Sequence, residues 1–229
     1  EGEATADLVA AVSALDVDQA EHWQTLHDHL DVDGFCDYLM LQWYAGVGDW
    51  PRNNWYANVR NDPNPGPVRY LAWDAEWSWD APRGGSAMGR VHPDFQASDT
   101  GGRGSAEVWN NLKNEKEFLL AFADRVYRNF FNDGPLTVAN NLARWQALNE
   151  GIRSAVIAES ARWGDGAGTL RTRDEDWQAE GDAIAGFIAQ GGEGGAPLQD
   201  DFIADLRAEG YYPAIAPPVI SAAGTALAS

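Results

Sequence analysis

Apolar residues recur at helical spacing over most of this chain. Phe118, Phe122, Val126 and Phe130 follow one another every four residues, which puts them on one face of a helix and predicts a buried stripe. Similar periodicity elsewhere predicts a mainly helical protein. The further helices are expected over about 4–15, 18–30, 32–46, 137–162, 174–190 and 197–208.

The helix expected over 32–46 has a broad apolar face. Phe35 and Leu39 lie on this face, and Asp31 is placed to cap the helix at its N-terminus. Cys36 is the single cysteine of the chain, so it cannot form an internal disulfide. Its position on an apolar helix favours a buried small hydrophobe over a reactive thiol.

The stretch from Thr137 to Arg162 is expected to form one continuous helix. Thr137 follows Pro135 and is a candidate N-cap. The residues expected to face the core are Leu142, Trp145, Leu148, Ile152 and Val156.

One segment has the alternation of strands instead. Trp55 to Arg60 alternate as a strand, Asn61 to Pro67 carry turn residues, and Val68 to Trp73 return as a second strand. The stretch from Asp80 to Ser105 is rich in Gly, Pro and Ser, and is expected to be a long loop. The sequence thus predicts one β-hairpin among helices, followed by a long connection.

Length and charge limit the classes of protein to consider. The chain has 229 residues with 45% hydrophobic content and eleven Trp, which is enough for one domain with its own core. Its net charge of -19 repels phosphate backbones and anionic lipid, so we expect neither nucleic acid nor a membrane surface as a partner. No run of about 18 apolar residues is present, so we expect no membrane span.

The residues around the hairpin have the order of a phosphoryl-transfer site. In protein kinases a loop aspartate accepts the proton of the substrate hydroxyl, and an asparagine five positions later binds a metal ion. A further aspartate, two short strands later, holds the metal against the nucleotide phosphates. Asp49, Asn54 and Asp74 have this spacing, and the expected hairpin would bring Asn54 and Asp74 together.

These residues lie in stretches that resemble the spore coat protein H (CotH) family of atypical, secreted protein kinases. The most specific stretch is Asp49-Trp50-Pro51-Arg52-Asn53-Asn54-Trp55-Tyr56, followed by a strand and the turn Trp73-Asp74-Ala75-Glu76. Residues 33–38, 122–134 and 157–165 resemble other stretches of the family, and the similarity covers about 30 to 213.

The resemblance implies an α+β fold: a mainly helical, atypical protein-kinase-like C-lobe whose β-hairpin carries the metal-site residues. The implied reaction is transfer of the γ-phosphoryl group of ATP to Ser or Thr of an extracellular or coat protein, by a secreted bacterial protein. Asp49 would accept the hydroxyl proton, and Asn54 and Asp74 would bind the nucleotide through Mg²⁺ or Mn²⁺. Glu76 stands where the family has an acidic residue, and would either bind the metal directly or support its ligands.

The chain departs from ordinary kinases in two ways. Residues 1 to 51 contain no Lys or Arg to bind nucleotide phosphates, and Val47-Gly48 stand where His-Arg would precede the aspartate. We therefore expect residues 1–210 to be the C-terminal lobe of a longer kinase domain, dependent on an upstream nucleotide-binding segment and inactive alone. Residues 211–229 are expected to be a linker toward a following module.

Two other functions remain open. One is a catalytically inactive CotH-like scaffold or adhesion module of a multidomain exoprotein, which the missing cation favours. The other is a carbohydrate-binding or carbohydrate-active domain, which the many Trp residues near carboxylates suggest. Trp55, Trp73, Trp77 and Trp79 surround the candidate site, and most of them are expected to wall the hairpin instead of stacking on adenine.

Overall fold

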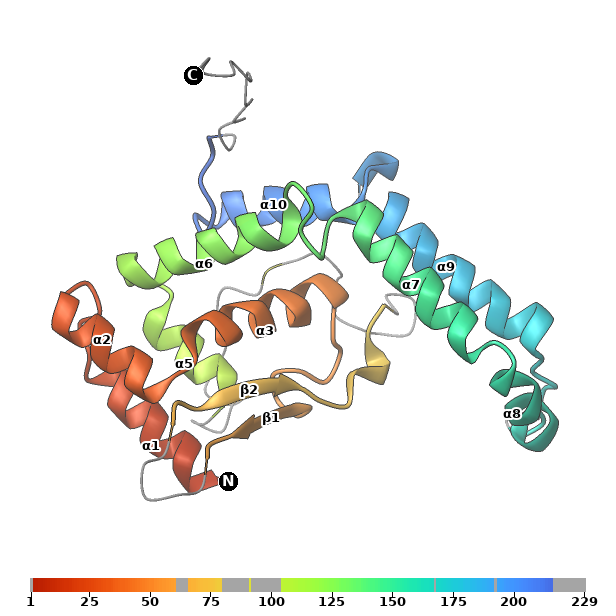
Figure 1. Ribbon diagram of the computed structural model, residues 1–229, viewed down its shortest axis with the longest axis horizontal. Helices are drawn as coiled ribbons and strands as arrows, with labels where there is room; N and C mark the ends of the chain where they lie inside the picture. Colours follow the sequence, from red (N-terminus) through yellow and green to blue (C-terminus); the bar gives the residue numbers. More distant parts are fainter. Residues whose placement is uncertain are drawn as a thin grey trace, which may run out of the picture.

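The computed structural model describes residues 2–60, 66–79, 91, 104–166, 168–191 and 193–215. Within these ranges the protein is mainly helical with one small antiparallel sheet, in agreement with an α+β fold (Figure 1). The elements are α1 (Gly2–Ser13), α2 (Ala20–His29), α3 (Val32–Ala45), β1 (Trp55–Asn58), β2 (Arg69–Ala72), α5 (Ser105–Leu112), α6 (Lys116–Phe130), α7 (Val138–Ile152), α8 (Ala155–Trp163), α9 (Gln178–Gln190) and α10 (Leu198–Ala208).

Helix α3 is the centre of the molecule and packs against both α6 and β2. Its start is set by Asp31, whose carboxylate accepts a hydrogen bond from the Gly34 N–H at 3.2 Å, as the sequence predicts. Its end is set by Gly46, which adopts a left-handed conformation with φ 62°. Cys36 is buried and unpaired, and burial is the main cause that raises the pKa of its thiol. The expectation of a buried, small hydrophobe at this position is confirmed.

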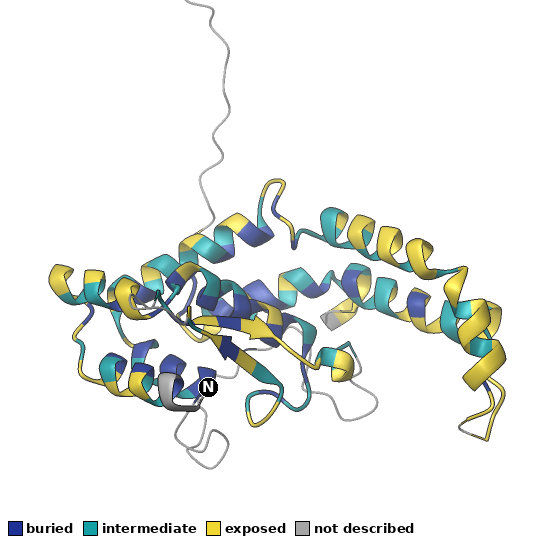
Figure 2. Ribbon diagram, turned by 60° about the horizontal axis from the view of Figure 1, so that its bottom comes forward, coloured by how far each residue is buried: buried dark blue, intermediate teal, exposed yellow. Residues whose placement is uncertain are grey.

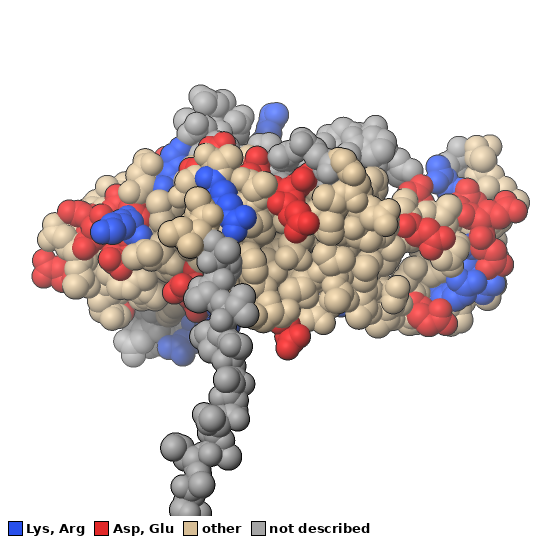
Figure 3. Space-filling view, turned by 90° about the horizontal axis from the view of Figure 1, so that it is seen from above, with Lys and Arg blue, Asp and Glu red and all other residues tan. Residues whose placement is uncertain are grey.

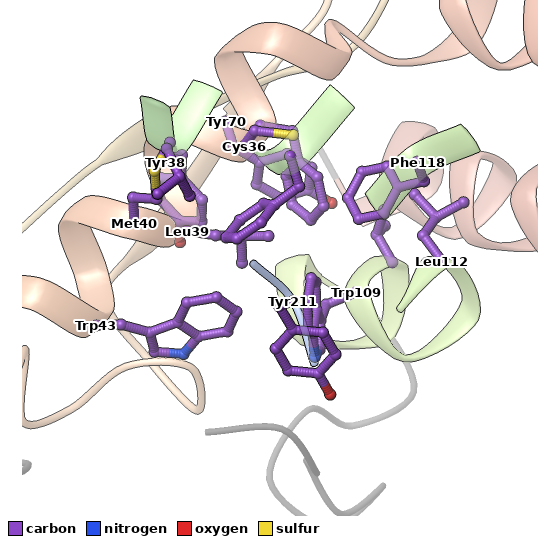
Figure 4. Close-up of a cluster of buried hydrophobic side chains, with 14 of the residues drawn as sticks. Cys36, Tyr38, Leu39, Met40, Trp43, Tyr70, Trp109, Leu112, Phe118 and Tyr211 are labelled. Carbon is purple, nitrogen blue, oxygen red and sulfur yellow. The ribbon is translucent and has the colours of Figure 1, made fainter. Parts of the chain in front are cut away.

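The apolar stripe of α6 is confirmed as core. Phe118, Phe122, Val126 and Phe130 are all fully buried. Figure 4 shows part of this core, where side chains from α3 and α5 meet Phe118 of α6 and Tyr211 near the C-terminus. The core is therefore built chiefly from α3, α5, α6 and α10.

A polar cluster also joins α3 to α6. Arg125 of α6 donates to both carboxylate oxygens of Asp37 on α3, with an Nε···Oδ1 distance of 2.9 Å. Asn129 donates to the same carboxylate at 2.7 Å. In the view of Figure 3, acidic side chains gather toward the two ends of the molecule. Arg125 with Asp37 is one of the ion pairs, but 16 Lys and Arg against 35 Asp and Glu leave the net charge at -19.

The predicted hairpin is present. β1 and β2 pair antiparallel with Trp55 opposite Ala72 and Tyr56 opposite Leu71. The hairpin is attached to the start of α3, because the Asp31 N–H donates to the Val68 carbonyl at 3.0 Å. Most of the predicted turn over 61–67 and of the predicted loop over 80–105 lies outside the described residues.

The prediction of one helix from Thr137 to Arg162 is wrong. The segment forms α7 and α8, with a break between Ile152 and Ala155, and no residue of either helix is fully buried. Leu148 and Ile152 were expected to face the core, yet they are 61% and 54% exposed. The reason is that α7 packs chiefly on α9, in an arm that projects from the core (Figures 1 and 2). One neighbour covers only one stripe of a helix.

Two residues of the expected linker belong to the core. Tyr211 and Tyr212 are only 9% and 7% exposed. The Tyr211 ring meets Trp109 edge-on with centroids 4.9 Å apart, and Tyr212 stacks on Phe131 at 5.8 Å. A linker after these residues stays a prediction, because 216–229 lie outside the described residues. None of the helices among the described residues is long and apolar enough to cross a membrane.

Candidate active site

The loop that follows α3 carries Asp49. The Asn53 N–H donates to the Asp49 carbonyl at 2.8 Å, which closes residues 49–53 into a turn. The side chain of Trp50 points into the core and is 5% exposed, whereas Asp49 is half-buried. The Asp49 carboxylate forms no hydrogen bond or ion pair with any other described residue, so it is available to a ligand.

The structure brings Asn54 and Asp74 together across the hairpin. The Asn54 side-chain Nδ2 donates to the backbone carbonyl of Asp74 at 2.9 Å. Both residues adopt left-handed conformations, with φ 55° and 52°, which Asn and Asp tolerate better than most residues. Because Nδ2 is engaged, Oδ1 is the atom of the Asn54 amide left to bind a cation. The exposed Asp74 carboxylate has no partner in the described part of the chain.

Two backbone hydrogen bonds fix the turn after Asp74 against the end of α3. The Gly48 N–H donates to the Trp77 carbonyl, and the Trp79 N–H donates to the Ala45 carbonyl, both at 2.9 Å. Glu76 lies in the short 3₁₀ turn Ala75–Trp77 and is exposed. The loop that carries Asp49 and the turn that carries Glu76 are therefore held side by side.

The donor set suits a hard divalent cation. Among the described residues, no three His, Cys, Asp or Glu side chains lie close enough to hold a metal ion by themselves. Mg²⁺ in nucleotide-dependent sites is bound through one or two protein carboxylates together with phosphate oxygens and water, so a complete protein cage is not required. An amide oxygen from Asn54 and a carboxylate from Asp74 fit that pattern. Direct ligation by Glu76 stays a prediction.

An exposed aromatic face lies next to Asp74. The expectation that most of the four tryptophans wall the hairpin holds for Trp55 and Trp79, which pack against the core. It does not hold for Trp73 and Trp77, which are 61% and 55% exposed. The Trp73 ring lies 5.9 Å from that of Tyr56, which is itself 36% exposed. The outer side of the hairpin thus offers flat apolar surface beside the candidate metal residues.

Arg52 is a candidate site residue that the sequence analysis missed. It lies inside the turn between Asp49 and Asn54, is exposed, and pairs with no acidic group in the described part of the chain. It is also the first cationic residue of the sequence. Its signal in the sequence is its position between Asp49 and Asn54.

Comparison with known protein families supports what the motifs indicate. Residues 2–193 match the model of the CotH kinase protein family, so the chain belongs to that family. No curated protein and no solved structure matches it. Membership suggests the use of ATP and a divalent metal.

Proposed function

We propose that this chain is the C-terminal lobe of a CotH-type protein kinase, which transfers the γ-phosphoryl group of ATP to a Ser or Thr hydroxyl of an extracellular or coat protein. The observation that carries the proposal is the hydrogen bond from the Asn54 amide to the Asp74 carbonyl. It joins two residues that are 20 positions apart in the sequence and that the kinase pattern assigns to one metal ion.

Asp49 is the proton acceptor in this proposal. The hydroxyl oxygen of the protein substrate forms a bond to the γ-phosphorus while the bond from that phosphorus to the β–γ bridging oxygen breaks, and ADP leaves. The hydroxyl proton passes to the Asp49 carboxylate. A bound Mg²⁺ or Mn²⁺, held by Asn54 and Asp74, would neutralise charge on the phosphates.

Arg52 supplies a cation that the N-terminal part of the chain lacks. A guanidinium on the same short turn as Asp49 suits contact with phosphate oxygens, where it offsets part of the field from a net charge of -19. The exposed rings of Tyr56 and Trp73 suit stacking by the nucleobase, because they lie on the hairpin face beside Asp74. Metal, phosphate and base contacts would then follow one another along the hairpin.

The alternative is an inactive CotH-like scaffold or adhesion module. Residues 1–51 contain no Lys or Arg, and such a module would not need the cation that a kinase uses ahead of its catalytic loop. The two functions differ in one measurable property, which is turnover of ATP.

Transfer of radiolabelled phosphate from ATP tests the proposal. The protein used carries the expected upstream nucleotide-binding segment, with Mg²⁺ or Mn²⁺, and the readouts are autophosphorylation and phosphorylation of casein. We expect label transfer by the unaltered protein and its loss in Asp49→Asn. Asp124→Asn is the matched control, because Asp124 is an exposed carboxylate on α6, away from the loop. A folded protein that transfers no phosphate with either metal would favour the scaffold function.

A further inference from the structure

A buried polar triad lies directly beneath the loop that carries Asp49. The Trp50 indole N–H donates to the Tyr38 hydroxyl at 2.6 Å and to the Ser105 hydroxyl at 3.1 Å. The two hydroxyl oxygens are 3.4 Å apart. Trp50, Tyr38 and Ser105 are only 5%, 3% and 1% exposed, so these bonds are not shared with solvent. Burial raises the pKa of Tyr38 to about 12, which keeps its hydroxyl neutral.

The triad ties together three distant parts of the chain. Tyr38 belongs to α3, Trp50 follows Asp49 in the loop, and Ser105 is the first residue of α5. Ser105 is 55 positions from Trp50. A buried hydrogen bond over that separation fixes one end of the Asp49–Asn54 loop to α5.

Gly104, the neighbour of Ser105, fixes the other end of the loop. It has φ 100°, a conformation that side chains rarely adopt. A Cβ at this position would lie 2.9 Å from the ring atom Cε2 of Trp55, the residue after Asn54. The Gly104 backbone therefore lies directly on the Trp55 ring. Two consecutive residues, Gly104 and Ser105, thus contact both ends of the loop.

We infer that Gly104 and Ser105 are positioning residues that hold Asp49 and Asn54 in their active arrangement. This inference rests on the proposed function for the roles of Asp49 and Asn54. On another side the loop is held by the hydrogen bond from Gly48 to Trp77. A loop fixed on two sides keeps its reacting groups in place before substrate binds, and small displacements of such groups lower turnover more than binding.

Hydrogen exchange tests the contact independently of catalysis. The probe is the Asn53 N–H, which closes the loop onto the Asp49 carbonyl, and the reference is the Val126 N–H inside α6. Ser105→Ala is expected to speed exchange at Asn53 about two- to tenfold, the range expected for one neutral hydrogen bond, and to leave Val126 unchanged. Ser154→Ala is the control, because Ser154 is exposed and its side chain does not cap α8.

A double-mutant cycle identifies the bond responsible. Trp50→Phe removes the indole N–H from the other side, so Ser105→Ala should add little to the exchange rate at Asn53 in that background. Gly104→Ala should speed exchange at the same amide through its clash with Trp55. The inference is overturned if Asn53 exchanges at the same rate in Ser105→Ala and in the unaltered protein. It is equally overturned if the exchange rates of the Asn53 and Val126 amides rise together, because that indicates general destabilisation.

Turnover provides the functional readout. In the protein that carries the upstream segment, Ser105→Ala is expected to lower kcat about tenfold while KM for ATP changes less than twofold. An equal effect on kcat and KM would refute a positioning role. If the unaltered protein transfers no phosphate, the proposed function fails, whereas the exchange measurements still decide whether Gly104 and Ser105 hold the loop.

Discussion

Asn54 has two separate tasks in the proposed site, and substitutions can separate them. Its Nδ2 holds the Asp74 carbonyl, and its Oδ1 is the proposed metal ligand. Asn54→Gly removes both atoms and tolerates the backbone φ of 55°. Asn54→Ala removes both atoms and also strains the backbone. Asn54→Asp keeps an oxygen ligand but loses the N–H donor.

The sizes of these effects follow from the structure. Loss of one half-exposed hydrogen bond costs about 0.5–1.5 kcal/mol of unfolding free energy. A non-glycine side chain in the left-handed region costs about 1–2 kcal/mol more. For a chain of this size about 1 kcal/mol corresponds to about 2–4 °C in Tm. We therefore expect Tm to fall by about 1–6 °C in Asn54→Gly and by about 3–14 °C in Asn54→Ala.

Metal binding adds a second, opposite effect on Tm. A ligand at about ten times its Kd stabilises the folded state by about 1.4 kcal/mol, so a suitable concentration of Mg²⁺ or Mn²⁺ should raise the Tm of the unaltered protein by about 3–6 °C. This increase should disappear in Asn54→Gly and Asn54→Ala, and should persist in Asn54→Asp.

Thermal unfolding followed by tryptophan fluorescence, with metal or with EDTA, measures both effects. Asn132→Gly is a close control, because Asn132 also has φ 55° and donates a side-chain hydrogen bond, at 3.1 Å to the Tyr127 hydroxyl. It should lower Tm to a similar extent and keep the whole metal-dependent increase. If Asn54→Gly gains as much Tm from Mg²⁺ as the unaltered protein does, Asn54 is not a metal ligand and the proposed site is wrong.

Four further predictions follow from the same geometry. Asp49→Asn should lower kcat by about 10²–10⁴-fold, as expected for loss of a general base, and leave the Kd of Mg–ATP within about twofold in calorimetry; unchanged turnover would exclude Asp49 as proton acceptor. Arg52→Ala should weaken the binding of Mg–ATP about tenfold, because one charge-assisted contact is lost, and an unchanged Kd would remove Arg52 from the site. Trp73→Ala should weaken the binding of Mg–ATP but not that of Mg–tripolyphosphate, which lacks a nucleobase; equal effects on the binding of both would contradict stacking. Phe122→Ala should lower the free energy of unfolding in urea by about 3–5 kcal/mol, whereas Leu148→Ala, at 61% exposure, should cost less than about 1 kcal/mol; similar losses would refute the burial of one or the exposure of the other.

Local features of this fold could be predicted from the sequence because they depend on neighbouring residues. The Asp31 cap needs only a carboxylate three positions before a free N–H. The stripe from Phe118 to Phe130 needs only helical spacing, and the hairpin needs two alternating runs around a turn. The same local reasoning places Asn54 near Asp74, because both flank one hairpin.

Contacts between distant segments could be settled only by the tertiary structure. Leu148 and Ile152 have the spacing of core residues, but periodicity identifies an apolar face without showing whether another element covers it. Trp73 and Trp55 are both aromatic residues of the hairpin, yet Trp55 packs on Gly104, whereas Trp73 meets the partly exposed Tyr56 ring and stays 61% exposed. Ser105 contacts Trp50 only because α5 folds back beneath the loop. The sequence by itself determined Asp49, Asn54 and Asp74 as candidate residues of the site, since their order and spacing along the chain are enough to select them. The tertiary structure decided what holds the site in place, because that depends on the approach of residues far apart in the chain.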